Sequence, residues 1–315
     1  MLALRTLLAH VVDYAGLFPP AGLAMAPAAR LYAAYRGGDA RWMLGRFVVP
    51  VARLEELEAA AGALLPVNAE LPDAPAPWTL SALVGSDVAA DLRAVVAFNA
   101  RHAPGAEGGR AVIDALEAKA AAPDDVARLA DALARAGLRD RAALYVELPF
   151  GAEAAPYATM AAAHGARLKL RTGGITADAF PPPAAVLDFL AACEAHDVTG
   201  KCTAGLHHPL RAEHALTYEP ECARGTMFGF VNVFLAAALL RAGHAPADVA
   251  PLLEERDPAA FDFDDAGAGW RGLRADVAAI ADARARRLVA FGSCSFDEPA
   301  HDLQTLGWWP GQALA

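Results

Sequence analysis

The sequence predicts an α/β fold, a (βα)8 TIM barrel with a helical elaboration between strands 7 and 8, formed by one domain over residues 1–315. Eight apolar runs of strand length follow one another, and segments with helical spacing separate most of them. Several runs are apolar nearly throughout, which is typical of parallel strands covered on both faces. No G-x-G-x-x-G motif follows the first run, so a doubly wound dinucleotide-binding sheet has no support.

Each expected strand is a short apolar run bounded by polar, glycine or proline residues. In the first run His10 and Asp13 interrupt the apolar pattern, but its two adjacent valines favour a buried strand. The expected strands are 8–14, 46–51, 78–84, 111–116, 143–148, 166–170, 198–203 and 288–292.

Segments between the runs repeat apolar residues every three or four positions, which predicts helices that cover the barrel. These helices are expected at 54–65, 88–101, 124–136, 157–164 and 183–196.

The stretch between the seventh and eighth runs is too long for an ordinary connection. Residues 209–287 are expected to form a helical insertion or lid, with helices at 227–241, 248–255 and 274–287. The tail, residues 302–315, contains Trp308 and Trp309. Two exposed tryptophans would be costly, so the tail is expected to pack on the body or on a partner.

The charge balance and cysteine pattern restrict the classes of partner and compartment. With 27 Lys+Arg against 37 Asp+Glu, the net charge of −10 argues against general binding to nucleic acid or an anionic membrane. No apolar run is long enough to span a bilayer, and the N-terminal segment is a poor match to a signal peptide. The four cysteines show no C-x-x-C spacing, so we expect free thiols in the cytoplasm.

The lysines are the most informative residues. There are 24 arginines but only 3 lysines, Lys119, Lys169 and Lys201, and all of them lie near expected strand ends, where barrel enzymes place their chemistry. Unlike arginine, lysine can lose its proton and form an imine. Lys169 and Lys201 lie on adjacent expected strands, so desolvation and mutual repulsion are expected to lower their pKa values. The alternative is that both lysines neutralise Glu147 and other buried carboxylates.

Three strand-end motifs resemble those of a known family. The motifs 169–173 (KLRTG), 201–205 (KCTAG) and 292–295 (GSCS) resemble the last three strand motifs of class I (Schiff-base) aldolases of the deoxyribose-phosphate aldolase type. Residues 112–114 (VID) resemble that family's segment with an acidic residue. The resemblance implies that Lys169 forms the Schiff base, that Lys201 perturbs it and that Asp114 assists proton transfer.

The turns after strands six to eight are the expected anion site. The resemblance implies phosphate binding by the backbones of Gly205 and Ser293, and small turn residues expose backbone N–H groups that can hold an anion. Thr172 and Gly173 lie in the first motif and are expected to contact substrate. Arg171 shares the strand face of the preceding lysine, so its guanidinium is expected to hold a carboxylate or phosphate, or to pair with a neighbouring acid.

Further polar residues lie at other expected strand ends. Asp13 opens a Gly/Pro-rich loop and either orients substrate or caps the loop, and Glu147 is a candidate general base. His207 and His208 follow strand seven and are candidates for substrate contact, for acid/base chemistry or for a loop cap. One of them with Glu147 could also bind a divalent metal.

Three functions follow from these patterns. The first is a lysine-dependent aldolase or lyase for a small anionic carbonyl compound, which needs no cofactor. The second is a metal-dependent hydrolase or lyase that uses Glu147, His207 and His208. The third is a non-catalytic barrel for binding or assembly, which predicts paired lysines with no open pocket between them. Self-association into a homo-oligomer is left open.

Overall fold

Parallel strands form a closed barrel at the centre of the molecule. The computed structural model describes residues 1–67, 76–103 and 109–309. Within these residues the barrel strands follow the order β1-β13-β7-β6-β5-β4-β3-β2, with parallel pairing throughout, which confirms the predicted (βα)8 barrel. The barrel strands are β1 (Val12–Tyr14), β2 (Leu44–Pro50), β3 (Trp78–Leu83), β4 (Ala111–Lys119), β5 (Ala143–Glu147), β6 (Arg167–Arg171), β7 (Gly200–Thr203) and β13 (Leu288–Ser293).

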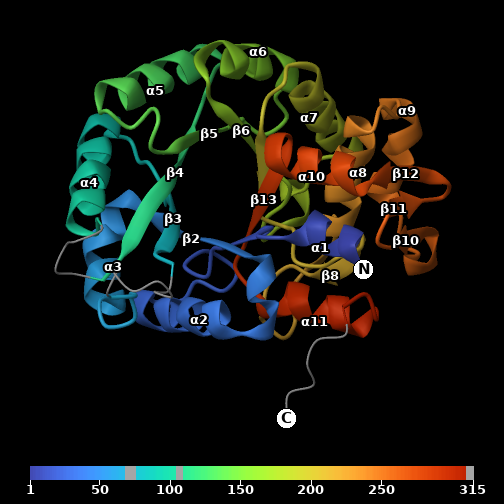
Figure 1. The fold of residues 1–315 in the computed structure, drawn as a ribbon, viewed down its shortest axis with the longest axis horizontal. Coiled ribbons are helices and arrows are strands. Elements are labelled where there is room, and N and C mark those ends of the chain that lie inside the picture. The colour runs from blue at the N-terminus through green and yellow to red at the C-terminus, as the bar shows by residue number, and fades with distance from the viewer. Residues whose placement is uncertain (68–75, 104–108, 310–315) are drawn as a thin grey trace.

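Helices surround the barrel, as Figure 1 shows. One of them, Val88–Arg101, lies where the sequence predicts it, and the Asp87 carboxylate caps it by accepting a hydrogen bond from the Ala90 N–H. The helices are α1 (Leu2–Leu8), α2 (Met25–Gly37), α3 (Leu54–Ala61), α4 (Val88–Arg101), α5 (Asp124–Arg135), α6 (Ala154–His164), α7 (Pro183–Ala195), α8 (Phe230–Arg241), α9 (Pro246–Val249), α10 (Val277–Arg286) and α11 (Asp297–Thr305).

The N-terminal segment differs from the prediction. Residues 8–14 are expected as one strand, but α1 ends at Leu8 and β1 holds only Val12–Tyr14. His10 adopts a φ of 51°, a left-handed conformation that cannot continue an extended strand. Helices α1, α2 and α11 are not predicted from the sequence.

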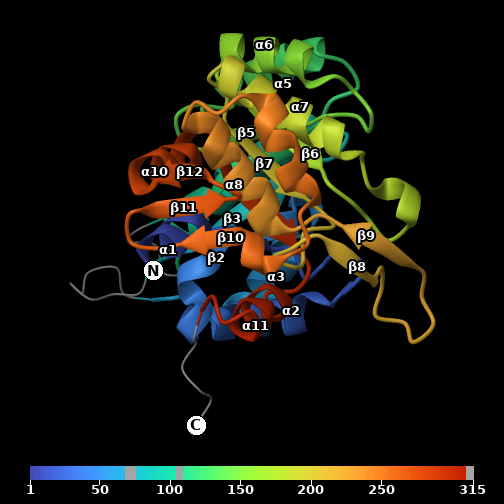
Figure 2. The ribbon, with the colours of Figure 1, turned by 90° about the vertical axis from the view of Figure 1, so that its right-hand side faces the viewer.

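Residues 209–287 contain strands as well as helices. Helices α8 and α10 lie within the ranges predicted at 227–241 and 274–287, whereas the helix predicted at 248–255 is the short α9 followed by a 3-10 segment at Ala250–Glu254. A hairpin of β8 (Ala212–Ala215) and β9 (Arg224–Met227) projects from the body in Figure 2. A second antiparallel sheet consists of β10 (Phe261–Phe263), β11 (Gly267–Trp270) and β12 (Leu273–Asp276). These strands are too short for a period of two to stand out in the sequence.

Helix α8 belongs to the barrel wall. All of its residues except Arg241 are buried, and it packs against α7 and α10. The segment therefore supplies the helix between β7 and β13, and its two small sheets are additions to the standard unit.

The described part of the C-terminal tail packs on the body. The Trp308 ring lies 5.6 Å from the ring of Phe261 and 5.1 Å from that of Phe263, measured between centroids. Trp309 lies 6.0 Å from Trp42 in the same measure. The remainder of the predicted tail, residues 310–315, lies outside the described residues. No helix among the described residues is long and apolar enough to cross a membrane.

Candidate active site

Strand register brings the predicted lysines together. Lys169 lies opposite Lys201 in the β6–β7 pair, and Glu147 lies opposite Lys169 in the β5–β6 pair. Each of these strands ends at most two residues beyond the residue concerned. Because the C-terminal ends of barrel strands meet at one mouth, the two lysines and Glu147 lie in the part of the barrel where enzymes of this fold place their chemistry.

Five buried side chains form a continuous ionic cluster: Asp13, Glu117, Glu147, Lys169 and Lys201. The Lys169 Nζ lies 2.5 Å from Glu117 Oε2 and 2.8 Å from Glu147 Oε2. The Lys201 Nζ lies 2.5 Å from Asp13 Oδ2 and 2.7 Å from Glu117 Oε1. Glu117 therefore connects the two ammonium groups, and the three carboxylates exceed the two lysines by one negative charge.

The carboxylates determine the charge state of the cluster. Burial alone would raise the pKa of Glu117, but Lys169 and Lys201 hold it well below its usual range. Burial alone would lower the pKa of Lys201, but Asp13 and Glu117 raise it above its ordinary value. The expectation that the neighbouring lysine lowers the pKa of Lys201 is wrong, because Asp13 and Glu117 lie against its ammonium. Lys201 is therefore a fixed cation in the barrel.

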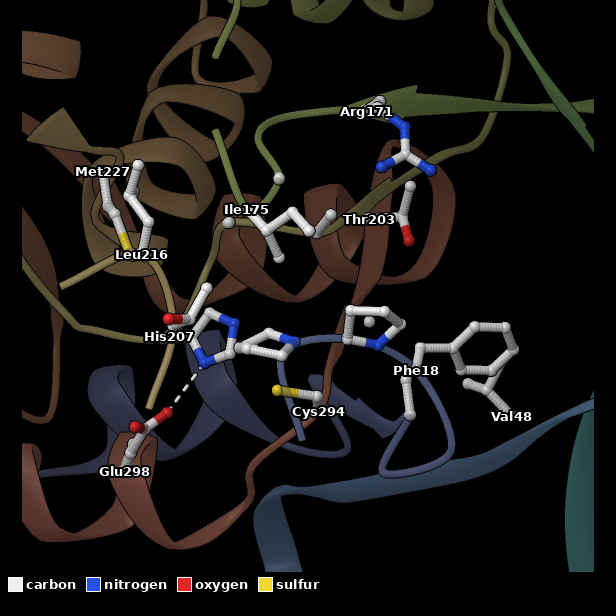
Figure 3. A pocket seen from close by; sticks show the side chains of 18 of the residues that line it. Phe18, Val48, Arg171, Ile175, Thr203, His207, Leu216, Met227, Cys294 and Glu298 are labelled. Atoms are coloured by element: carbon white, nitrogen blue, oxygen red, sulfur yellow. Dashed lines mark hydrogen bonds and ion pairs between the residues drawn. The ribbon is translucent and has the colours of Figure 1, made fainter. Parts of the chain in front are cut away.

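A pocket of about 420 Å³ opens above the cluster. Glu117, Glu147, Lys169 and Arg171 line it, whereas Lys201 and Asp13 do not. Lys169 is thus the cluster lysine that a ligand in the pocket can reach. Apolar side chains form much of the remaining wall (Figure 3), and they include Phe18, Pro19, Pro20, Val48, Leu83, Ile175, Leu216 and Met227.

The two histidines face carboxylates of α11. His207 Nδ1 lies 2.7 Å from Glu298 Oε2, the contact marked in Figure 3, and His208 Nδ1 lies 2.6 Å from Asp302 Oδ2. Burial alone would lower the pKa of His207, but its interactions with Cys294 and Glu298 raise it to about 9. Both histidines line the pocket, so the imidazolium of His207 supplies a cation on the side formed by α11.

The residues expected to form the anion site have different environments. Gly205 lines the pocket, but Thr172, Gly173 and Ser293 are buried beneath its surface. The Thr172 hydroxyl donates to the carbonyl of Ala204 at 2.6 Å. A Cβ on Gly205 would lie 2.7 Å from the Gly173 Cα, so the two turns pack backbone against backbone. Thr172 and Gly173 therefore shape the turns, and nothing in their contacts faces the pocket.

Asp114 is not brought to the lysines. Arg46 holds its carboxylate with two hydrogen bonds of 2.7 and 2.8 Å, and the pair lines a different hollow. The β3–β4 register passes from Ile113 directly to Ala115, so a bulge at Asp114 shifts the alternation of the strand. The acid that β4 contributes to the cluster is Glu117.

Glu117 was not selected from the sequence, although it lies next to the predicted end of strand four. The strand continues to Lys119, three residues beyond the predicted end at 116. The signal for Glu117 is its position at a strand end, where Ser81 of β3 also donates a hydrogen bond of 2.6 Å to its Oε1. A strand bulge does not show in the apolar pattern, so the choice between the two acids needed the structure.

The predicted metal set is not assembled as a cluster. Within residues 1–67, 76–103 and 109–309, no group of three or more His, Cys, Asp or Glu side chains has the arrangement of a metal site. Glu147 pairs with Lys169, and His207 and His208 each pair with a carboxylate on α11.

The mouth of this barrel therefore combines a lysine that lines the pocket, two carboxylates in contact with it and a pocket wall that is mainly apolar. No protein-family model matches the chain, and a search of curated proteins finds no match.

Proposed function

We propose that the protein is a lysine-dependent, Schiff-base-forming aldolase or lyase for a small anionic carbonyl compound. The observation that carries the proposal is the position of Lys169. Its Nζ contacts Glu117 and Glu147 at 2.5 and 2.8 Å, and its side chain lines the mouth pocket. Barrels place catalytic groups at this end, and the fold is common among enzymes.

In the proposed reaction Lys169 first transfers a proton to Glu147. Its neutral amine then attacks the substrate carbonyl carbon, a C–N bond forms as the C=O π pair moves to the oxygen, and a proton passes from the attacking nitrogen to that oxygen to give a hydroxyl. Glu147 returns the proton to that hydroxyl, and water leaves as the iminium forms. The iminium accepts the electron pair released when a C–C bond breaks or an α-proton departs.

The remaining cluster residues hold Lys169 in place. Glu117 contacts both lysines, and the ammonium of Lys201 keeps Glu117 ionised. Because Lys201 and Asp13 lie beneath the pocket, their role is to fix the charge and position of Glu117. A fixed array of this kind needs no reorganisation when charge develops at the imine.

Two cations on the pocket wall support an anionic substrate. The Arg171 side chain is 40% exposed, its Nε lies 3.6 Å from Glu147 Oε1, and the guanidinium faces the pocket in Figure 3. The His207 imidazole, with its raised pKa, is the second cation. The two groups lie on opposite sides of the pocket in that view, so they suit a ligand whose anionic group binds one of them.

The two alternatives receive less support from the geometry. The binding-module hypothesis predicts that both lysines are paired with carboxylates and that no open pocket lies between them. Both are so paired and Glu117 lies between them, but a pocket reaches Lys169 from the mouth, and an assembly module has no need of it. The metal-dependent hypothesis requires Glu147 and the histidines to share one ion, whereas each pairs with a different partner.

Borohydride trapping tests the proposal. The protein is incubated with small aldehydes, ketones and keto acids, reduced with borohydride and digested, and adducts are located by peptide mass spectrometry. We expect an adduct on Lys169 that is lost in Lys169→Met. Lys119→Met is the matched control, because Lys119 also lines the pocket but is exposed and lies outside the cluster.

Two results would contradict the proposal. One is an adduct whose yield is the same in Lys169→Met. The other is no adduct from any carbonyl compound together with about one tightly bound metal per chain, which would favour the metal-dependent alternative.

A further inference from the structure

A second hollow, of about 730 Å³, lies at the opposite end of the barrel. Helices α1 and α10 form two of its sides, and the first residues of β2, β6 and β13 form its base. We call it the basal hollow and define it by Arg5, Trp42, Arg46, Tyr145, Arg167 and Arg284, which line it. Tyr145 separates it from the ionic cluster, because the Lys201 Nζ lies 5.2 Å from the centroid of its ring.

The lining of the basal hollow is strongly basic. It contains four arginines and no aspartate or glutamate. Arg46 has a carboxylate partner, Asp114. This concentration of positive charge occurs in a chain whose net charge is −10, so it is a local feature and not the background composition.

Three of the arginines have no carboxylate partner among the described residues. Arg167 donates to the Tyr145 hydroxyl at 2.9 Å. The guanidinium carbon of Arg5 lies 4.9 Å from the Trp42 ring centroid. Arg284 donates to two backbone carbonyls, one of them that of Ala9 at 2.9 Å. Among the described residues, therefore, no carboxylate forms an ion pair with any of these three guanidinium groups.

Two buried donors in the same lining lack an acceptor. Within the described chain, Arg284 Nε and Trp42 Nε1 have no hydrogen-bond partner. A buried donor without an acceptor is destabilising, and the cost is larger for a charged group. Burial also lowers the pKa of Arg284 to about 9, against the influence of Asp13 and Tyr145. An anion with several oxygens would offset both the unpaired charge and the missing acceptors.

We propose that the basal hollow is a binding site for a small, multiply charged anion with phosphate-type oxygens. Guanidinium N–H groups pair strongly with such oxygens, and Arg284 offers its unpaired Nε–H. Three guanidinium groups match a ligand with two or more negative charges. The site is distinct from the mouth pocket and does not depend on the imine chemistry proposed for it. A phosphate ester and a free inorganic anion share this chemistry, so the test uses both.

Isothermal titration calorimetry at low ionic strength tests the site, with inorganic pyrophosphate and a sugar phosphate as separate probes. We expect binding by the wild-type chain that weakens as salt is added. Arg167→Gln is expected to weaken it roughly tenfold, because a charge-assisted pair is lost. Arg5→Gln is the second variant, since Arg5 is exposed and its removal leaves the barrel intact. Arg93→Gln, an exposed arginine on α4, is the matched control.

The outcomes separate this site from the mouth pocket. Weaker binding in Arg167→Gln or Arg5→Gln, with Arg93→Gln unchanged, supports the proposal. If the Arg167 variant fails to fold by circular dichroism, the Arg5 variant decides. No binding of either probe at low salt would overturn the proposal. So would binding that only Arg171→Gln removes, because the anion would then lie at the mouth.

Discussion

Replacing Lys201 with methionine tests whether the ionic cluster is held together by charge. Methionine keeps much of the side-chain volume but removes an ammonium that contacts Asp13 at 2.5 Å and Glu117 at 2.7 Å. The Lys201 residue is 1% exposed, so water cannot replace it. Removing one partner of a buried ion pair costs about 3–5 kcal/mol, because the remaining charge is uncompensated. We expect a melting temperature lower by roughly 6 °C or more.

The pH dependence provides a second readout of the same variant. In the wild type the pKa of Glu117 is lowered by the two lysines, so its contribution to stability is present above pH 4.5 and decreases as the pH falls below that value. In Lys201→Met the folded-state pKa of Glu117 rises, and protonation relieves the unpaired charge. The difference in unfolding free energy between the two proteins should therefore shrink as the pH falls toward 4.

Urea denaturation at pH 7 and pH 4, followed by circular dichroism, measures both effects. Lys119→Met is the control, because Lys119 is exposed and is expected to change stability by no more than about 0.5 kcal/mol. A Lys201→Met protein within about 1 kcal/mol of the wild type at pH 7 would refute the reasoning. An equal loss at both pH values would show that packing, and not charge, is responsible.

Three further predictions concern other parts of the structure. Asp114→Asn should leave imine trapping unchanged. In urea denaturation it should lower the unfolding free energy by no more than about 1 kcal/mol, because the ion pair of Asp114 with Arg46 is partly exposed. A loss of trapping would return Asp114 to the candidate catalytic residues. Gly205→Ala should lower the unfolding free energy by at least about 2 kcal/mol, since the φ of Gly205 is +72° and the new Cβ meets Gly173. Gly243→Ala, at φ +93° with open space around the new Cβ, should lower it less. Equal losses in the two variants would contradict the packing argument. The pKa of His207 is raised from 6.5 to about 9, so the unfolding free energy of the wild type should decrease by on the order of 3 kcal/mol as the pH rises between these values. His207→Gln should abolish this pH dependence in thermal denaturation. An unchanged pH dependence would assign the effect to another group.

The barrel could be predicted because its determinants are local. Most barrel strands are largely apolar, and α4 occupies the predicted residues because a periodic apolar stripe begins after a capping aspartate. The structure differs from the prediction at segments whose sequence carries no local signal. The left-handed backbone conformation of His10 makes the turn between α1 and β1, and the strands β8 to β12 are too short to show a period.

The candidate site was predicted only in part. Lys169, Lys201 and Glu147 follow from strand ends and from the scarcity of lysine, and the structure places them in contact with one cluster. Asp114 and Glu117 lie on the same strand, and the only sequence signal that separates them is that Glu117 directly follows the predicted strand end whereas Asp114 lies within the run. The bulge at Asp114 decides which one faces the mouth through the pairing of β3 with β4.

The sequence by itself determined the fold class, the number of barrel strands and the lysines at the mouth, because hydrophobic periodicity and residue type are properties of short segments. Only the tertiary structure decided the charge state of those lysines and which of them lines the pocket. Asp13 and Lys201 are 188 positions apart, yet their side chains lie 2.5 Å from each other. Electrostatic energy depends on distance and burial, which arise when the barrel closes and which no segment encodes alone. The same closure collects the arginines of the basal hollow from α1, β2, β6 and α10.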